Sequence, residues 1–480
     1  MFESFPRPRP FADRWFADPA PFLRARWLFL RALGAIFAAA FGALWFQIQG
    51  LIGPNGILPA AEYLREAKGA VGAKAYWLIP TLLWVDAGRV AVTVLVLVGL
   101  AASVAIVLNL WPRVAIGVAL LAWLSFVTAA REFSAYQSDS MLLEAAFLSL
   151  FLAPRGVRPG MGWHDPPTRA AVFLLQWLWF RIYFESGLVK ILSGEEQWRN
   201  LTAMDRYYEN GPLPTWIAWY AQRLPHGFHA ATALATLLVE LFVVWLVFAP
   251  RRARVAAFCI TAPLQVGIIL TANYAFLNYL VLALGLMLLE EEPLTRPSAT
   301  LSPRSGARGL QIVAFPAVFI LSIVIFLTPF DPLAQFRIIN NYGLFAVMTR
   351  ERYEIEFQGT RDGKTWIAYP FRFKPQDPRR APGIYAPYQP RFDWNLWFAS
   401  FGTVSSNPWV MNVQERLLEN EPDVLQLFAG NPFASAPPHA VRAVRWQYWF
   451  TTSNERARTG NWWNRRFLGE YSPVQMKHLR

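Results

Sequence analysis

The sequence predicts a polytopic α-helical membrane bundle of about nine spans, followed by an exported β-rich domain. Hydrophobic residues make up 55% of the 480 residues and charged residues only 16%, whereas a soluble domain carries roughly 25% charged residues. Long apolar runs continue as far as residue 328, and alternating apolar and polar residues follow Pro329. We therefore expect a transmembrane helical domain at residues 1–329 and an exported β-rich domain at residues 330–480.

Nine apolar runs are candidate spans, because a spanning helix needs about 20 mainly apolar residues, and fewer when other helices surround it. They cover residues 27–49, 89–110, 114–130, 140–153, 171–192, 230–249, 255–271, 275–289 and 312–328. The run 140–153 is short and contains Glu144, so we expect it to face the bundle interior. A further run, 78–85, contains Pro80 and favours an interfacial or re-entrant piece.

Arginine clusters set the predicted orientation. They precede the first run and follow the second, fourth, sixth and eighth runs: Arg7, Arg9, Arg14, Arg24, Arg26, Arg113, Arg155, Arg158, Arg169, Arg251, Arg252, Arg254, Arg296, Arg304 and Arg308. With nine spans these clusters share one side, so the positive-inside rule places the N-terminus in the cytoplasm and residues after 328 outside. Arginine-rich, alanine-rich composition is typical of a GC-rich bacterial genome, which predicts the bacterial inner (plasma) membrane.

The net charge of +13 lies in these short clusters, and no recognition motif accompanies it. Nucleic acid is therefore excluded as a partner. The single cysteine, Cys259, lies in an apolar run, so no intramolecular disulfide can form. The N-terminal segment is too charged to predict a cleavable signal peptide.

The exported domain is expected to begin with a hairpin. Residues 352–373 alternate around Asp362 and Gly363, which is typical of a tight turn between two strands. Aromatic and β-branched residues continue through 392–401 and favour a further strand. Residues 440–452 alternate again, and residues 413–429 between them predict one helix.

Three charges lie in or at the end of the fifth apolar run. Arg181 and Glu185 are spaced i, i+4 and can pair on one helix face. Lys190 has no carboxylate at i±3 or i±4, so its amine is a candidate catalytic base. It could equally be an anchor that reaches the headgroups, or pair across the bundle with Asp139, Glu144 or Glu240.

The ionisable residues of the apolar runs are predicted to form one intramembrane network with a structural role. Its expected members are Asp139, Glu144, Arg181, Glu185 and Glu240. Removing one partner of a buried pair costs about 3–5 kcal/mol. Single substitutions should therefore lower the amount of protein rather than its activity alone.

Two groups of residues are candidate client-binding sites. Arg391, Asp393, Trp394 and Trp397 combine arginine with tryptophan, as binding hot spots do, although such residues also fill the cores of small domains. The loop 202–225 carries several aromatic residues, and its client-binding candidates are Trp216 and Trp219. This loop could be an interfacial anchor, or a lid over a lipid-facing site.

The sequence predicts neither a metal nor a cofactor. His226 and His229 are spaced i, i+3, but no third ligand lies nearby. A Gly-x-Ser-x-Gly elbow and a phosphate-binding Gly-Lys-Ser/Thr loop are both missing from the sequence. A solute transporter is disfavoured because the sequence has no inverted repeat.

Several sequence blocks resemble the lipase maturation factor family and occur in family order over nearly the whole chain. They are QIQGLIGPNGILP (47–59), SDSMLLEAAFL (138–148), SGLVKILSGEEQWRNLTAM (186–204), PLPTWIAWYAQRLP (212–225), GTRDGKTW (359–366), KPQDPRRAP (374–382), YQPRFDWNLWFA (388–399), NPF (431–433) and WWNRRFLGEYSP (462–473). The family comprises polytopic membrane proteins of the eukaryotic endoplasmic reticulum that certain lipases require to reach an active, assembled state. Ser138 and Met141 depart from the family motif, and its exported cysteines are absent, which puts any redox mechanism in doubt.

A second resemblance is shorter. Gly187 to Ile191, followed by Trp198, is similar to a segment of vitamin K-dependent γ-carboxylases. In those enzymes the lysine that matches Lys190 is regarded as the base that deprotonates the reduced quinone.

Together these patterns predict a maturation factor that assists folding or assembly of secreted lipases or other envelope clients. It would bind them on the exported face, with membrane lipid around it and no cofactor. The alternative is a membrane enzyme of the quinone-dependent oxygenase or carboxylase type that uses Lys190 as base. Whether Lys190 lines a lipid-accessible cavity or a packed helix end distinguishes the two.

Overall fold

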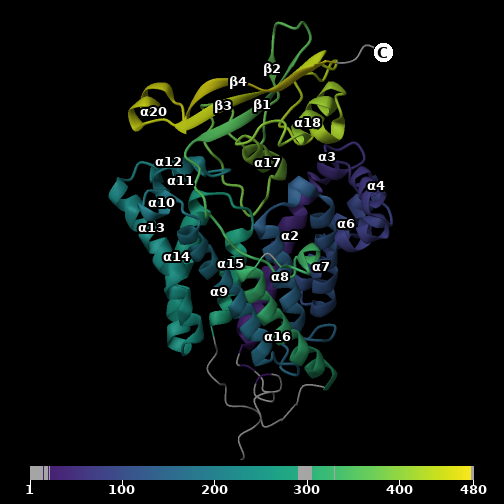
Figure 1. Ribbon diagram of the computed structural model, residues 1–480, viewed down its shortest axis with the longest axis vertical. Coiled ribbons are helices and arrows are strands. Elements are labelled where there is room, and N and C mark those ends of the chain that lie inside the picture. The colour runs from purple at the N-terminus through teal and green to yellow at the C-terminus, as the bar shows by residue number, and fades with distance from the viewer. Residues whose placement is uncertain (1–14, 16–19, 21, 290–304, 329, 477–480) are drawn as a thin grey trace, which may run out of the picture.

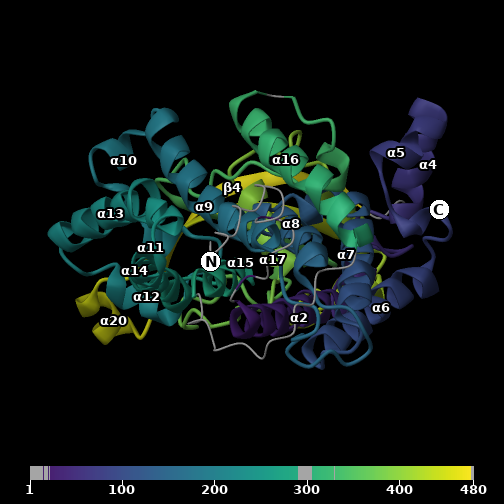
Figure 2. The ribbon, with the colours of Figure 1, turned by 90° about the horizontal axis from the view of Figure 1, so that it is seen from below.

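The protein is a helical bundle with a sheet-containing domain on one end (Figure 1). We describe it from a computed structural model that covers residues 15, 20, 22–289, 305–328 and 330–476. The helices of the first two thirds of the chain run mostly along the long axis of the molecule, and the strands lie across its upper end. Seen from below, α2 and α16 lie on opposite long sides, with α8 and α15 between them (Figure 2).

Each of the nine predicted runs falls on a helix. The helices at these positions are α2 (Leu23–Trp45), α6 (Arg89–Val107), α7 (Pro112–Ala129), α8 (Gln137–Leu152), α9 (Arg169–Leu192), α13 (His226–Leu241), α14 (Arg251–Thr271), α15 (Leu277–Gly285) and α16 (Ser305–Leu327). Within the described residues, five segments are long and apolar enough to cross a membrane: Leu23–Trp45, Arg89–Val107, Pro112–Ala129, His226–Phe248 and Arg251–Thr271. Of the other four, α8 and α15 are short, α9 carries several charges, and the apolar part of α16 is Val313–Leu327.

Short elements connect these helices at the end of the bundle that faces the sheet. They are α3 (Ile48–Ile52), α4 (Ala60–Val71), η1 (Gly72–Lys74), α5 (Ala75–Leu78), η2 (Leu82–Trp84), η3 (Arg131–Ser134), α10 (Glu196–Arg199), η4 (Ala203–Asp205), α11 (Tyr207–Asn210) and α12 (Trp216–Ala221). At the opposite end, η5 (Val243–Phe248) and η6 (Leu286–Leu288) extend α13 and α15. The run 78–85 is broken near Pro80 into two short turns, because proline cannot continue a helix.

The C-terminal domain contains a four-stranded antiparallel sheet in the order β2-β1-β3-β4. Its strands are β1 (Arg352–Thr360), β2 (Ile367–Ala368), β3 (Ala440–Phe450) and β4 (Trp463–Met476). The predicted hairpin is confirmed, since Gln358 pairs with Ala368. Asp362 closes its turn by accepting hydrogen bonds from the backbone N–H groups of Lys364 (2.8 Å) and Thr365 (2.7 Å).

Helices fill the rest of this domain and correct two predictions. They are α17 (Arg391–Ala399), α18 (Trp409–Leu418), α19 (Pro422–Leu425) and α20 (Ser453–Thr459), with η7 (Ala334–Phe336) before the sheet. The strand expected at 392–401 is α17; the domains enclose it so completely that its apolar residues show no single-sided pattern. The single helix expected at 413–429 is broken where Asn420 adopts a positive φ of 58° and Pro422 starts a new turn.

The two parts of the chain share an extensive interface. The guanidinium of Arg89, at the start of α6, forms an ion pair with Asp423 of α19. Asn412 and Arg416 of α18 donate hydrogen bonds to the backbone carbonyls of Ile57 (3.0 Å) and Gly56 (3.2 Å). The position of the C-terminal domain is therefore fixed by direct contacts with the residues that follow α3 and with the start of α6.

Candidate functional site

Helix α9 places four polar side chains along one buried stretch. It begins at Thr168, whose hydroxyl accepts a hydrogen bond from the N–H of Ala171. Arg181 and Glu185 lie one turn apart, and Ser186 and Lys190 lie one turn apart further along the helix. All four side chains are buried, so each needs a partner inside the protein.

Arg181 is the centre of the first cluster. Its guanidinium donates to Glu185 and to Glu144 of α8, each at 2.8 Å. It also donates to the backbone carbonyl of Asn340. The predicted Arg181–Glu185 pair is therefore present, and Glu144 is its third member.

The strap, which we define as residues 340–349, runs beside α9 and contains a turn at Leu344 and Phe345, where Phe345 has a positive φ of 58°. Its backbone N–H groups donate to the buried carboxylates: that of Asn340 to Glu144 (2.9 Å) and that of Tyr342 to Glu185 (2.9 Å). The hydroxyl of Tyr342 donates to Glu144 at 2.7 Å. The buried charges of α8 and α9 thus satisfy backbone groups of a segment that, within the described residues, pairs with no strand.

Lys190 forms the second cluster and also holds the strap. Its ammonium lies 2.9 and 2.8 Å from the two carboxylate oxygens of Glu240, and it donates to the carbonyl of Leu344 at 2.8 Å. The ring of Trp198 lies 5.1 Å away. Because only 1% of Lys190 is exposed, its environment is that of a packed helix end and its amine is fully occupied.

Asp139 forms the third cluster, with Arg391 of α17. Two guanidinium nitrogens of Arg391 lie 2.7 and 2.8 Å from the two carboxylate oxygens of Asp139. The same guanidinium donates to the carbonyl of Phe133 at 2.7 Å and lies 4.8 Å from the ring of Phe126. The predicted single network is wrong, because the partners of Lys190 and Asp139 separate its members into three clusters.

The client-contact prediction for α17 is also corrected. Arg391 and Asp393 are buried, and Trp394 and Trp397 are 6% and 8% exposed. Arg391 joins the two domains, and the two tryptophans line a cavity between them. These residues lie at an interface within the chain, which agrees with the alternative that they fill a core.

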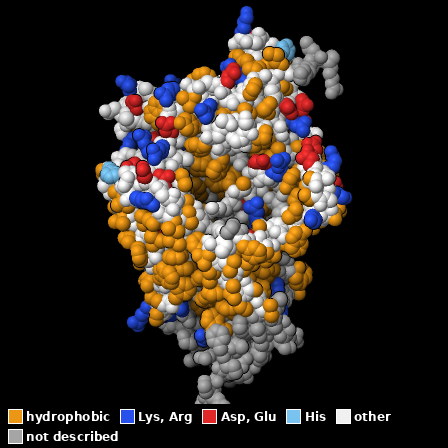
Figure 3. Space-filling model, viewed as in Figure 1, with side chains coloured by type: hydrophobic (Ala, Val, Ile, Leu, Met, Phe, Trp, Pro, Cys, Tyr) orange, Lys and Arg blue, Asp and Glu red, His pale blue; other side chains and the backbone are white. Residues whose placement is uncertain are grey.

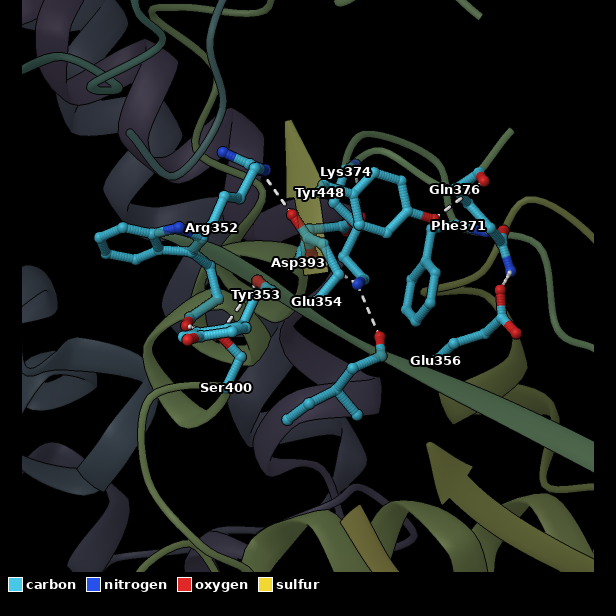
Figure 4. Close-up of polar contacts among 12 residues, drawn as sticks. Arg352, Tyr353, Glu354, Glu356, Phe371, Lys374, Gln376, Asp393, Ser400 and Tyr448 are labelled. Atoms are coloured by element: carbon cyan, nitrogen blue, oxygen red, sulfur yellow. Dashed lines mark hydrogen bonds and ion pairs between the residues drawn. The ribbon is translucent and has the colours of Figure 1, made fainter. Parts of the chain in front are cut away.

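A fourth buried cluster, which the sequence did not reveal, joins the sheet to the bundle (Figure 4). Glu354 of β1 accepts from Arg352 at 2.6 Å and from Lys374 at 2.7 Å. Arg352 also donates to the carbonyl of Glu209 (3.0 Å) and to that of Pro212 (2.8 Å) in the loop 202–225. The cluster thus fixes the sheet to this loop.

Asp393 lies beside this cluster (Figure 4), and no cation of the described residues forms an ion pair with it. One of its carboxylate oxygens accepts from the backbone N–H groups of Phe373 (3.3 Å) and Lys374 (3.1 Å). Burial raises the pKa of Asp393 to about 6, against the partial opposition of these hydrogen bonds and of the Lys374 charge.

The raised pKa of Asp393 predicts a pH-dependent stability. Its contribution is fully present below its ordinary pKa near 4 and is lost as the pH rises through about 6. Relative to Asp393→Asn, the wild type should lose roughly 2 kcal/mol of unfolding free energy between pH 4 and pH 8. Thermal unfolding in detergent at both pH values measures this, with the exposed Asp377→Asn as control. A constant difference between wild type and Asp393→Asn would contradict it.

The aromatic loop 202–225 packs partly on the C-terminal domain. Trp219 is buried, and its indole N–H donates to the hydroxyl of Thr451 at 3.3 Å. The guanidinium of Arg456 lies between two rings, 4.6 Å from that of Trp219 and 3.6 Å from that of Trp462. Trp216 is 44% exposed. Trp219 therefore holds α12 against the sheet domain, and Trp216 is free to contact lipid or a client.

The histidines are explained without a metal. The imidazoles of His226 and His229 lie 3.0 and 3.2 Å from the same carboxylate oxygen of Asp205. The described part of the chain contains no group of three or more metal-ligating side chains. These histidines therefore stabilise the start of α13.

A cavity of about 400 Å³ lies between the bundle and the C-terminal domain. It is lined by the start of α8, by α11 and the residues after it, by the start of α15, by the strap and by α17. At this level the molecule has a hollow with hydrophobic side chains inside it, between a charged upper part and an apolar belt (Figure 3). The cavity can hold an apolar molecule of moderate size.

These features define the class of the protein: a multi-pass membrane protein whose helical bundle holds a sheet-containing domain on one end. Two family models match the chain. The lipase maturation factor transmembrane domain matches residues 24–296, and the lipase maturation factor C-terminal domain matches residues 338–473. The chain therefore belongs to the lipase maturation factor family.

Individual relatives support the assignment. Lipase maturation factor 1 of Bos taurus is 32% identical over an alignment that covers 94% of this chain and 89% of the relative. Lipase maturation factor 2 of Homo sapiens is 30% identical over 93% of this chain and 82% of the relative. No solved structure matches the chain.

Proposed function

We propose that the protein assists folding or assembly of secreted lipases or other exported clients by binding them on the exported face. Family membership over nearly the whole chain supports this, since the relatives are named for lipase maturation. The buried clusters of α9 support it as well. They hold the strap and leave no free nucleophile or base, as expected of a binding scaffold rather than a catalytic centre.

The proposed arrangement is a nine-span bundle, residues 1–329, in a bacterial inner membrane with a cytoplasmic N-terminus. The exported domain, residues 330–480, follows it. The surface supports this orientation: in this view Asp and Glu side chains accompany the Lys and Arg side chains near the sheet, whereas those at the lower end of the apolar belt are Lys and Arg (Figure 3). Arg113 and Arg251 lie at helix starts on that side, as the positive-inside rule requires of a cytoplasmic face.

The proposed client surface is the outer edge of β4, and this edge is the main structural support for client binding. β4 is the last strand in the sheet order, so among the described residues no strand pairs with its outer edge. Phe467 is 50% and Leu468 37% exposed, beside the exposed Arg465 and Arg466. An open edge with apolar side chains can pair with an extended segment of an incompletely folded client. Trp216 lies in α12, which packs beside α20 near the start of β4.

We expect the double substitution Phe467→Asp/Leu468→Glu to abolish most of the rescue of lipase activity, because charge on this edge opposes docking of an apolar segment. The measurement is the specific activity of secreted lipase, at equal lipase mass, from cells that lack the protein and carry each variant. Ile367→Glu is the matched control, since Ile367 is 46% exposed on the opposite edge strand β2. Full rescue by the double variant at normal protein level would refute docking on β4.

A further inference from the structure

The cavity between the two domains has a buried aromatic surface and an exposed apolar mouth. Large aromatic side chains form its buried surface: Tyr136, Tyr207, Tyr274, Trp394 and Trp397. At its mouth, Val347 and Phe398 are 70% and 51% exposed. The apolar belt of the bundle ends at this level (Figure 3), and amphipathic aromatic residues are typical of the membrane–water boundary.

Five buried polar atoms of the lining residues lack hydrogen-bond partners in the described part of the chain. They are the hydroxyls of Tyr136, Ser138 and Tyr207 and the indole N–H groups of Trp394 and Trp397. These residues are at least nine-tenths buried. Buried donors without acceptors are rare and costly, so a ligand of this cavity should present acceptor oxygens within an otherwise apolar body.

A second, polar cavity of about 220 Å³ adjoins the first and shares its lining residues Ala135, Tyr136 and Gln137. Its other lining residues include Arg337 and Asp331, together with Asn340 and Asn341 of the strap. A cation and a carboxylate in one small cavity suit a zwitterionic group that carries both a phosphate and an amine.

We propose that the two cavities together bind one zwitterionic glycerophospholipid of the surrounding bilayer. An acyl chain lies along the aromatic walls, and its ester carbonyls accept from the indoles of Trp394 and Trp397. The phosphate lies beside Arg337 and the amine beside Asp331. Because the strap and α17 form much of the wall, the lipid joins the bundle to the C-terminal domain. This assignment is independent of the identity of the client.

The test uses a phosphatidylethanolamine with a photoreactive diazirine in one acyl chain, added to the full-length protein in lipid nanodiscs. We expect labelled peptides from the strap and from α17. Labelling should fall roughly tenfold in Trp394→Phe/Trp397→Phe, which keeps a smaller aromatic ring at each position and removes two hydrogen-bond donors. Ala346→Trp fills the cavity from the strap and should abolish labelling, whereas Ala73→Trp, exposed in η1, should leave it unchanged.

Equal labelling of the wild type, Ala346→Trp and the double tryptophan variant would overturn the proposal, because the probe would then report only lipid around the bundle. That result is also expected if an apolar client segment occupies the cavity. Displacement of the photoreactive lipid by an excess of soluble glycerol phosphate would equally overturn it, since the headgroup alone would then account for binding. A normal far-ultraviolet circular dichroism spectrum and a normal elution volume of each variant confirm that it is folded.

Discussion

Arg391→Ala is expected to destabilise the protein by about 3–5 kcal/mol. The guanidinium of Arg391 and the carboxylate of Asp139 are both fully buried and form a two-point ion pair between α17 and α8. Removing the guanidinium leaves the carboxylate without a countercharge. The C-terminal domain should therefore loosen from the bundle, which limited proteolysis and thermal unfolding in detergent both detect.

The ion pair of Arg89 with Asp423 provides a matched control. It also joins the bundle to the C-terminal domain, but 54% of the Arg89 side chain is exposed. Exposed pairs contribute little to stability, so Arg89→Ala should have a much smaller effect than Arg391→Ala. If the two substitutions lowered stability equally, burial of the ion pair would not explain the importance of Arg391 for holding the two domains together.

Lys190→Leu is expected to lower the amount of folded protein strongly, because it leaves the carboxylate of Glu240 buried without a cation. The double substitution Lys190→Leu/Glu240→Leu removes both charges and should restore most of the protein. This double variant still loses the hydrogen bond that Lys190 donates to the carbonyl of Leu344. Immunoblotting of membranes measures the protein level, and the secreted lipase assay measures function.

The double variant separates the two roles considered for Lys190. A structural lysine predicts that restored protein is accompanied by restored lipase activity. If Lys190 is a base, the double variant would instead be present in the membrane yet inactive. That outcome would contradict our assignment and favour the enzyme alternative.

Local patterns predicted much of the fold. Apolar runs located the helices, since hydropathy is a property of each segment alone, and alternation around Asp362 located the hairpin. The same reasoning failed for α17, where the helix is buried on nearly all sides and aromatic residues resemble a strand. It also missed the strap, whose role depends on side chains of α8 and α9 that precede it by more than a hundred residues.

Spacing predicted the Arg181–Glu185 pair, but the partners of Lys190 and Asp139 could not be derived from it. Glu240 is 50 residues from Lys190, and Arg391 is 252 residues from Asp139, whereas helical periodicity relates only residues three or four positions apart. Composition also cannot distinguish a surface for clients from an interface between domains, because arginine and tryptophan serve both. The polar run of Asn340, Asn341 and Tyr342 was the one signal of the strap in the sequence.

The most direct test of the central claim is the specific activity of secreted lipases, compared at equal lipase mass, from cells with and without this protein. Our account predicts that loss of the protein lowers specific activity, and that the wild-type gene restores it while the secreted mass stays similar. Unchanged specific activity of every secreted lipase in the deletion strain would contradict the proposed role in lipase maturation.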